Sequence, residues 1–421
     1  MEVNELYIKK NIIAIDLKSF FASCECVERN LNGETTPLVV CDPTRNGAMT
    51  LAVTPYLKSL GVKGRTRVYD LPKNIKIIKV PPRMGLYQRK SKEVINIYRE
   101  FVADEDMHVY SIDEVFLDVT NYLNYYKKSA LELAKVILDR IKEKTGLTAV
   151  AGVGPNILLA KVCMDLDGKH SKDNIGIWTY DDVTTKLWNI TPLSKMWGIG
   201  PRMEKRLNNL KIFTIGDLAR YNRYALKDKF GILGEDLWYH ANGIDLTKIS
   251  DLNKPPKEQS ISHSQILYKD YDETNISIII KEMVDHLTRR LRNIKKKASI
   301  IGFGINYSKA IGGGFGHTVK LDKYTGDTNE IVEICLNIFD KYYENLPIRK
   351  VSIYLSGLTD INGVQLNLFE SFENIILKDK VDKAVDLIKE KYGANSLLKA
   401  SSLLSDSTII TRNLKNGEEK Y

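Results

Sequence analysis

Two adjacent carboxylates, Asp113 and Glu114, stand between two apolar runs in the segment HVYSIDEVFLDVT, and a third, Asp16, ends the apolar stretch NIIAID. In a regular strand neighbouring side chains point to opposite faces, so Asp113 and Glu114 can share a ligand only where a strand bends or ends. Such a cluster suits Mg²⁺, which prefers hard oxygen ligands, and two ions would support a phosphoryl-transfer displacement. A solvated hairpin tip is the alternative that these residues leave open.

The elements around these carboxylates alternate between strand and helix patterns. The strand pattern is predicted over 11–16, 36–42, 74–81 and 148–154, and the helix pattern over 19–30, 54–61, 88–102 and 129–146. Residues 106–112 and 115–120 read as the two arms of a hairpin. If the strand 11–16 lies beside this hairpin, Asp16 reaches the edge where Asp113 and Glu114 lie. One hairpin in a mixed order predicts an α/β or α+β sheet with helices on a face.

The length and composition indicate a soluble multidomain protein. A chain of 421 residues exceeds what one core usually organises, which predicts two to four domains. It is 43% hydrophobic and 27% charged, and it has no apolar run near the ~18–20 residues of a membrane helix, so no membrane partner is expected. Five cysteines without a C-x-x-C pair, and no evident secretory signal, predict reduced thiols and a cytoplasmic location.

The charge distribution is compatible with a polyanionic partner. The formal net charge is +9, and the basic residues gather between an amphipathic stretch and a strand-like segment. The members of this basic cluster are Arg289, Arg290, Arg292, Lys295, Lys296 and Lys297. The cluster can be interpreted either as a solvated helix end or as a set of phosphate contacts.

A glycine-rich turn, Gly198-Ile199-Gly200, precedes a helix that is predicted to begin at Pro201, a favoured first position. Free backbone N–H groups at such a turn suit a phosphate. The pattern resembles the helix-hairpin-helix element, which contacts the DNA backbone without reading sequence. Gly198, Gly200 and Arg202 are therefore candidate DNA contacts, and an ordinary helical turn is the alternative.

The C-terminal part divides at the linker-like segment 251–260. Strands and two amphipathic helices alternate between 261 and about 358, and the remainder holds the peptide VQLNLFE and an amphipathic helix within 380–393. The glycine run 312–314 lacks the form of a dinucleotide loop and reads as a flexible turn.

The segments AIDLKSFFASCECVE, YSIDEVFLDVT, VGPNILLAKVCMDL and the GIG turn, in this order, resemble the motif series of Y-family translesion DNA polymerases. The details are most similar to the UmuC-like branch of Gram-positive bacteria, and the resemblance covers essentially the whole chain. It implies a Mg²⁺-dependent, template-directed nucleotidyltransferase with low fidelity that copies past damaged bases. It also suggests expression induced by DNA damage.

The resemblance assigns roles to individual residues of the palm. It implies that Asp16, Asp113 and Glu114, with the backbone carbonyl of Leu17, hold two Mg²⁺ ions. Phe21 matches the steric gate, whose ring excludes a ribose 2′-hydroxyl, and an ordinary core aromatic is the alternative reading. The neighbouring ring of Phe20 is grouped with it as a nucleotide-binding residue.

The triphosphate-binding positions depart in part from the family pattern. The family's Tyr-x-x-Arg falls on Pro55 and Lys58, which puts the tyrosine contact in doubt and replaces a bidentate guanidinium with an ammonium. Lys169 matches a second triphosphate-binding lysine. Leu51 falls where family members place a residue against the nascent base pair.

The resemblance also divides the chain into a right hand with an additional domain. It implies a palm at 1–33 and 78–170, small fingers at 34–77, and a helical thumb with the helix-hairpin-helix at 171–245. An α/β little finger at 257–358 and a C-terminal tail at 359–421 follow. The whole is an α+β multidomain fold.

The peptide QLNLF resembles the clamp-binding peptide of bacterial polymerases, and its candidate contacts are Gln365, Leu366, Leu368 and Phe369. An exposed Leu and Phe in a linker favour a partner groove. The expected partners are primer–template DNA, deoxynucleoside triphosphates, the bacterial sliding clamp and possible accessory repair proteins.

Two other functions are weighed against the polymerase. A non-catalytic adaptor that binds DNA and the clamp could keep a polymerase-like fold, and the altered positions Pro55 and Lys58 leave room for it. A structure-specific nuclease could use the helical thumb and two metals. Intact carboxylates at all three positions argue against the adaptor.

Overall fold

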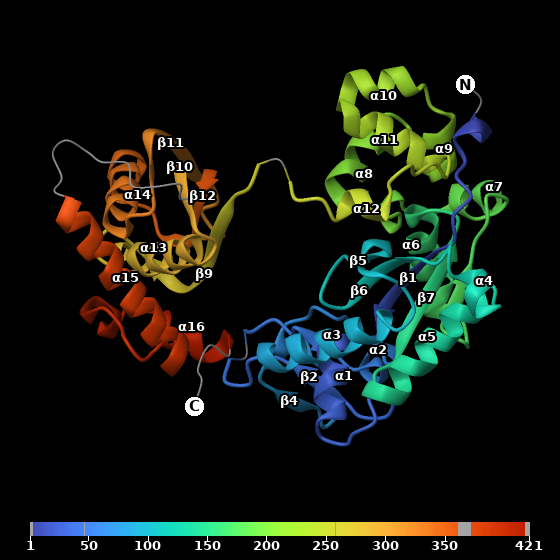
Figure 1. Ribbon diagram of the computed structural model, residues 1–421, viewed down its shortest axis with the longest axis horizontal. Coiled ribbons are helices and arrows are strands. Elements are labelled where there is room, and N and C mark those ends of the chain that lie inside the picture. Colours follow the sequence, from blue (N-terminus) through green and yellow to red (C-terminus); the bar gives the residue numbers. More distant parts are fainter. Residues whose placement is uncertain (1–2, 46, 257, 361–371, 417–421) are drawn as a thin grey trace. The chain divides into compact units, whose positions relative to one another are not determined.

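The computed structural model describes residues 3–45, 47–256, 258–360 and 372–416. The chain separates into two compact units, 1–254 and 255–421 (Figure 1). Each unit is described by itself below.

A five-stranded sheet with the order β5-β6-β1-β7-β8 forms the centre of the first unit. β1 (Ile12–Leu17) lies between β6 (Glu114–Asp118) and β7 (Ala149–Gly154) and is antiparallel to both. The remaining strands are β5 (Met107–Val109) and β8 (Ile175–Ile177). The predicted strand 11–16 therefore lies beside the predicted hairpin, as the grouping of the three carboxylates requires.

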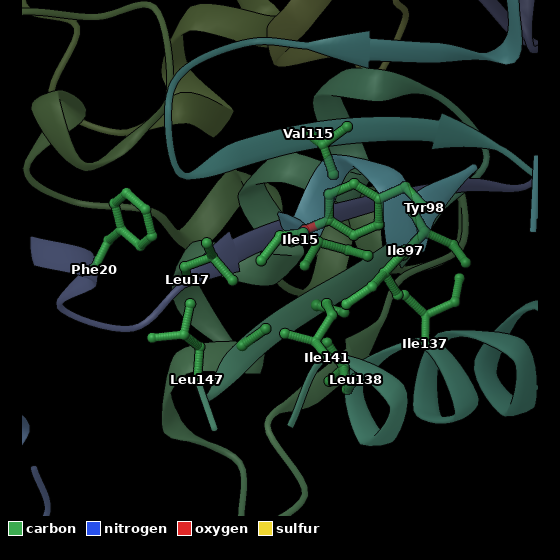
Figure 2. Close-up of a cluster of buried hydrophobic side chains, with 14 of the residues drawn as sticks. Ile15, Leu17, Phe20, Ile97, Tyr98, Val115, Ile137, Leu138, Ile141 and Leu147 are labelled. Carbon is green, nitrogen blue, oxygen red and sulfur yellow. The ribbon is translucent and has the colours of Figure 1, made fainter. Parts of the chain in front are cut away.

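The side chains of β1 alternate between two hydrophobic clusters. Ile13, Ile15 and Leu17 belong to the cluster formed with α3 (Met84–Tyr98) and α5 (Ala130–Thr145), and Figure 2 shows part of this cluster. On the other face the strand packs against α6 (Ile157–Leu166) through Ile12 and Ala14. Because the period of a strand is two residues, Asp16 continues the row of Ile12 and Ala14 on the α6 face.

The helix α5 shows how local sequence fixes an element of this core. Ser129 and Glu132 form a reciprocal capping box at its start, and Gly146 ends it with a φ of 71°, a conformation that favours glycine. α3 begins at Met84, four residues before the predicted start at Gln88. Arg83 and Tyr87 at this added turn bind a buried glutamate described below.

A small three-stranded sheet, β3-β2-β4, accompanies the central sheet. Its strands are β2 (Leu38–Val40), β3 (Ala52–Val53) and β4 (Ile78–Val80), with α1 (Phe20–Val27) and α2 (Pro55–Ser59) nearby in sequence. β4 pairs with β2, so the small sheet extends three residues past the predicted fingers boundary at residue 77. Pro55 occupies the first turn of α2, where its missing N–H costs nothing.

Helices make up the rest of the first unit, around their own hydrophobic cluster. They are α7 (Asp182–Thr185), α8 (Pro201–Asn208), α9 (Ile215–Arg220), α10 (Arg223–Phe230), α11 (Ile232–Ala241) and α12 (Ile249–Leu252), and a short α4 (Leu123–Tyr126) precedes α5. The predicted helix start at Pro201 is confirmed.

The second unit is an antiparallel sheet with the order β11-β10-β12-β9, joined by one hydrophobic core to two helices. The strands are β9 (Ile261–Tyr271), β10 (Lys296–Tyr307), β11 (Gly314–Thr325) and β12 (Ile348–Asp360), and the helices are α13 (Ile276–Asn293) and α14 (Thr328–Tyr342). This is the alternation of strands and two amphipathic helices that the sequence predicts.

The C-terminal segment that the sequence suggested as a tail folds onto this second unit. α15 (Phe372–Tyr392) is tied to α13 by an ion pair between Lys389 and Asp285 at 3.0 Å. The loop before α16 (Ile409–Asn416) accepts a hydrogen bond at 2.7 Å from the Tyr271 hydroxyl to the Asp406 carbonyl. The clamp-binding candidates Gln365, Leu366, Leu368 and Phe369 lie outside the described residues.

All five cysteines are buried and free. Within the described ranges, every helix is too short or too polar to cross a membrane.

A pair of histidines in the second unit gives it an expected dependence on pH. The rings of His263 and His286 lie 4.8 Å apart, and burial lowers the pKa of each from 6.5 to about 4. In addition, the ring of His286 lowers the pKa of His263, Arg412 and Arg290 lower the pKa of both histidines, and Asp285 opposes the effect at His286. Both imidazoles are therefore neutral in the folded protein near neutral pH.

The unfolded chain protonates these histidines near pH 6.5, whereas the folded protein does so only near pH 4. The contribution of the histidines to the free energy of unfolding is therefore complete above pH 6.5 and is lost as the pH falls toward about 4. We expect the second unit to lose about 2 kcal/mol between pH 7.5 and 5, after allowing for partial solvent exposure. Urea unfolding of the full chain at both pH values measures it. A double variant, His263→Gln with His286→Gln, should lose that part of the pH dependence, and an unchanged dependence would contradict the assignment.

Candidate active site

Asp16 and Glu114 face each other across two neighbouring strands. Asp16 of β1 and Glu114 of β6 are direct partners in the strand register, and the cluster memberships of Phe116 and Ala14 place both on the α6 face. Like charges directly opposite each other destabilise a sheet unless a cation compensates them. The register therefore creates a need for positive charge at this point.

Asp113 joins the pair at the bend before β6. Its carbonyl accepts a hydrogen bond from the Leu17 N–H at 2.9 Å, and its side chain accepts one from the Ser111 hydroxyl at 2.6 Å. Ser91 on α3 donates to the Ile112 carbonyl at 2.6 Å, which holds the same bend from below. The hairpin tip thus directs Asp113 toward β1.

Two lysines from the α6 region supply the positive charge. Lys161 Nζ lies 2.7 Å from Glu114 Oε1, and its side chain is only 8% exposed. Lys169 Nζ lies 2.7 Å from Asp16 Oδ2. Asp165 stands between the two lysines, 3.2 Å from Lys161 and 2.8 Å from Lys169. The five groups form one chain of alternating charges.

Burial and the neighbouring lysines change the pKa values of these carboxyl groups in opposite directions. Burial raises the pKa of the Asp16 carboxyl above its ordinary value, while Lys169 lowers it and Asp113 raises it further. Burial also raises the pKa of Glu114, and Lys161 opposes that change. The burial of these carboxylates is offset here by ion pairs with lysine ammonium groups.

Lys58 of α2 faces the same carboxylates from the small sheet. Burial lowers the pKa of its ammonium, Asp16 and Asp113 raise it, and the nearby ammonium of Lys169 lowers it. Lys58 thus lies within the electrostatic reach of both Asp16 and Lys169. Leu51, also from this region, is 38% exposed.

The two aromatic candidates of α1 have different surroundings. Phe20 is 3% exposed and belongs to the core (Figure 2). Phe21 is partly buried, and its ring lies 4.6 Å from that of Tyr87. Phe21 is thus the member of this pair with accessible surface.

Tyr87 is itself fixed by a buried ionic group. Its hydroxyl donates to Glu25 at 2.7 Å, and Glu25, with no exposed surface, also binds Arg83 at 2.6 Å and Arg29. A buried carboxylate that is satisfied by two guanidinium groups and a hydroxyl holds its partners firmly. Tyr87 therefore provides a rigid support for the ring of Phe21.

The glycine-rich turn keeps the geometry that the sequence suggested. Gly198 has a φ of 91°, and a Cβ added at Gly198 or Gly200 would meet nothing within 4 Å. The conformation at Gly198, rather than crowding, requires glycine, and the backbone of the turn stays open to a ligand. Arg202 in the first turn of α8 is exposed.

The basic cluster of the second unit is partly engaged within the protein. Arg292 pairs with Asp386 at 2.7 Å and Arg289 with the same carboxylate at 3.8 Å, both through α15. The other contacts link Arg290 to the Ser262 carbonyl at 3.0 Å and Lys296 to Asp360 at 2.9 Å. Lys295 is exposed and Lys297 half-buried. Arg289 and Arg292 thus join α13 to α15, and Lys296 and Lys297 are the first residues of β10.

Two residues that the residue-by-residue reading did not single out are central to the site, namely Lys161 and Asp165. Both lie in the segment VGPNILLAKVCMDL, and Lys161, Asp165 and Lys169 follow one another at intervals of four. This i, i+4 spacing of opposite charges is visible in the sequence. Their meeting with Asp16 and Glu114 depends on the packing of α6 against the sheet.

The donor chemistry of the site fits a divalent cation. Carboxylate oxygens are the ligands that Mg²⁺ prefers, and Asp16, Asp113 and Glu114 lie at one edge. In the part of the chain that the structure describes, no three Asp, Glu, His or Cys side chains converge as a ready-made metal-binding group, and Asp16 and Glu114 each face an ammonium. A bound cation would compensate the negative charge of these carboxylates, which the two lysine ammonium groups compensate in this structure.

Family models match most of the chain. The impB/mucB/samB family matches residues 15–165, its C-terminal domain residues 258–368, and the HHH motif of the same family residues 180–212. The last range confirms the helix-hairpin-helix predicted around the glycine-rich turn.

Related proteins extend over nearly the full length. The putative UV-damage repair protein UvrX of Bacillus subtilis (strain 168) is 40% identical over 410 residues, 96% of each chain. DNA polymerase IV 2 of the same organism is 31% identical over 97% of this chain and 98% of its own. A solved Y-family DNA polymerase chimera of Dbh and Dpo4 shares the fold, with a TM-score of 0.68 and 22% identity, over 83% of this chain and 99% of its own. The chain therefore belongs to the impB/mucB/samB family and is a DNA polymerase of the Y family.

Proposed function

We propose that this polymerase carries out translesion synthesis and that its reaction takes place at the edge formed by Asp16, Asp113 and Glu114. The observation that carries the proposal is the direct pairing of Asp16 with Glu114 in the strand register, with Asp113 at the adjoining bend. Residues far apart in sequence meet here in a partly buried cluster of carboxylates. The name of the UvrX relative, a putative UV-damage repair protein, supports a role in damage tolerance.

The residues divide the work of phosphoryl transfer. The primer 3′-hydroxyl attacks the α-phosphorus of the nucleotide, the bond from that phosphorus to the bridging oxygen breaks, and pyrophosphate leaves. Two Mg²⁺ ions bound by Asp16, Asp113, Glu114 and the Leu17 carbonyl would stabilise both the attacking and the leaving oxygens. Lys169, which pairs with Asp16, and Lys58, whose ammonium feels the charge of Asp16, bind the triphosphate as point charges.

Selection of the nucleotide is assigned to the small sheet and α1. The ring of Phe21, supported by Tyr87, excludes a ribose 2′-hydroxyl, with Phe20 as its buried neighbour. Leu51, which is exposed, contacts the nascent base pair. Small fingers at 34–77 would leave a roomy pocket that tolerates damaged template bases.

The DNA contacts are assigned to backbone-binding elements of both units. The turn Gly198–Gly200 with Arg202, and the basic cluster of the second unit, contact phosphates and so hold DNA without reading its sequence. Gln365–Phe369 is assigned to the sliding clamp, and accessory repair proteins are possible further partners. Such a protein works in the cytoplasm.

Single-nucleotide primer extension on an undamaged and an abasic template, with Mg²⁺ or with excess EDTA, tests the proposal. We expect insertion on both templates with Mg²⁺ and none with EDTA. Arrest before every abasic site would contradict translesion synthesis, and extension in EDTA would contradict the metal. DNA binding without extension, even with clamp added, would favour the adaptor, and degradation of labelled duplex without nucleotides would favour the nuclease.

A further inference from the structure

The carboxylate of Asp165 is shared between two lysines. Its Oδ1 lies 2.8 Å from Lys169 Nζ and its Oδ2 lies 3.2 Å from Lys161 Nζ. Both intervals are four residues, so α6 and the turn after it bring the three side chains onto one line. Asp165 is thus the link between the lysine that faces Glu114 and the lysine that faces Asp16.

Lys169 has two acceptors of different kinds. Asp16, at 2.7 Å, belongs to the carboxylate edge where a divalent cation would bind, whereas Asp165 stands outside that edge. A cation on Asp16 would compete with the Lys169 ammonium for this carboxylate. Asp165 would then be the acceptor that keeps Lys169 beside the site.

We propose that Asp165 is a positioning residue, which holds the ammonium of Lys169 in reach of the nucleotide triphosphate after Lys169 has left Asp16. The inference rests on the proposed function of Lys169. Asp165 itself does not touch the substrate and acts through Lys169.

Two physical effects make this anchor necessary. A lysine side chain has four rotatable bonds. Holding it in one place costs conformational entropy, which an ion pair at 2.8 Å offsets. In addition, Lys161 and Lys169 would face each other as like charges if the carboxylate between them were neutral. Asp165→Asn therefore loosens Lys169 in both ways.

The test is a double-mutant cycle on single-nucleotide insertion, with the full chain, Mg²⁺ and primer–template DNA. Lys169→Met should raise the KM for the incoming nucleotide about 10-fold, and Asp165→Asn should raise it several-fold with kcat changed less than about 2-fold. Combined, the two changes should give the KM of Lys169→Met alone, because Asp165 acts only through Lys169. Asp165→Glu, which keeps the charge, should restore most of the affinity.

A matched control is Asp167→Asn, because Asp167 lies two residues further on and binds Lys186 and the Trp178 indole instead. It should leave the KM unchanged. Additive effects of Asp165→Asn and Lys169→Met, or a loss of kcat rather than a rise in KM, would overturn the inference and indicate a structural role. If Lys169→Met raises KM but Asp165→Asn does not, only this inference fails. If Lys169→Met has no effect, the proposed triphosphate contact fails with it.

Discussion

Asp113→Asn should reduce primer extension at least about 1,000-fold, equivalent to roughly 4 kcal/mol of transition-state stabilisation. The amide is nearly isosteric with the carboxylate, so the hydrogen bonds of the bend to Leu17 and Ser111 can persist. What is lost is one negative charge at the bend beside Asp16 and Glu114, where the proposed cations would bind. Single-turnover insertion under saturating nucleotide measures the effect.

The control for this prediction is Asp118→Asn on the same strand. Asp118 pairs with Lys10 at 3.0 Å at the other end of β6. The substitution Asp118→Asn therefore also removes one negative charge from this hairpin. We expect its extension rate to stay within about 3-fold of the wild type. Affinity for primer–template DNA should be similar in both variants. Comparable losses in the two would show that charge on the strand, rather than the position of Asp113, governs activity.

The second large effect concerns the choice of sugar. Phe21→Val should lower the preference for deoxynucleotides over ribonucleotides about 100-fold, because the shorter side chain no longer fills the space of a 2′-hydroxyl. Phe21 is only partly buried and rests on Tyr87, so the substitution should leave the core intact. The ratio of kcat/KM for matched deoxy- and ribonucleotides gives the measurement.

Phe101→Leu is the matched control for Phe21→Val. Phe101 is another aromatic packed against the same core, near Tyr126, and its loss should cost stability without changing sugar preference. A preference that survives in Phe21→Val would return Phe21 to the role of a core aromatic. A change in both variants would mean that general loosening of the palm sets the preference.

The strands and helices were largely predictable because their signals are local. The apolar run 11–16, the hairpin around Asp113 and the helix that begins at Pro201 all appear where the pattern predicts them. Boundaries were less accurate where a tertiary partner decides them. The start of α3 at Met84 and the place of β4 in the small sheet both depend on contacts with residues distant in sequence.

The C-terminal segment shows the same limit on a larger scale. Its amphipathic helix was predicted, but the sequence does not show what its polar face binds. In the structure Asp386 pairs with Arg292, a residue whose charge alone suggested a phosphate contact. A cationic side chain pairs with whichever anion the fold brings near, and this is not a property of its own segment.

The sequence by itself determined the chemical inventory of this polymerase, namely which carboxylates, lysines and aromatic rings exist and in which order their motifs follow. Only the tertiary structure decided that Asp16 lies opposite Glu114, and that Lys161, Asp165 and Lys169 of the α6 region meet them. The physical reason is that spacing along a chain fixes which face a side chain occupies on its own strand or helix. Which other face it meets is fixed by strand pairing and by the burial of apolar surface between α6 and the sheet.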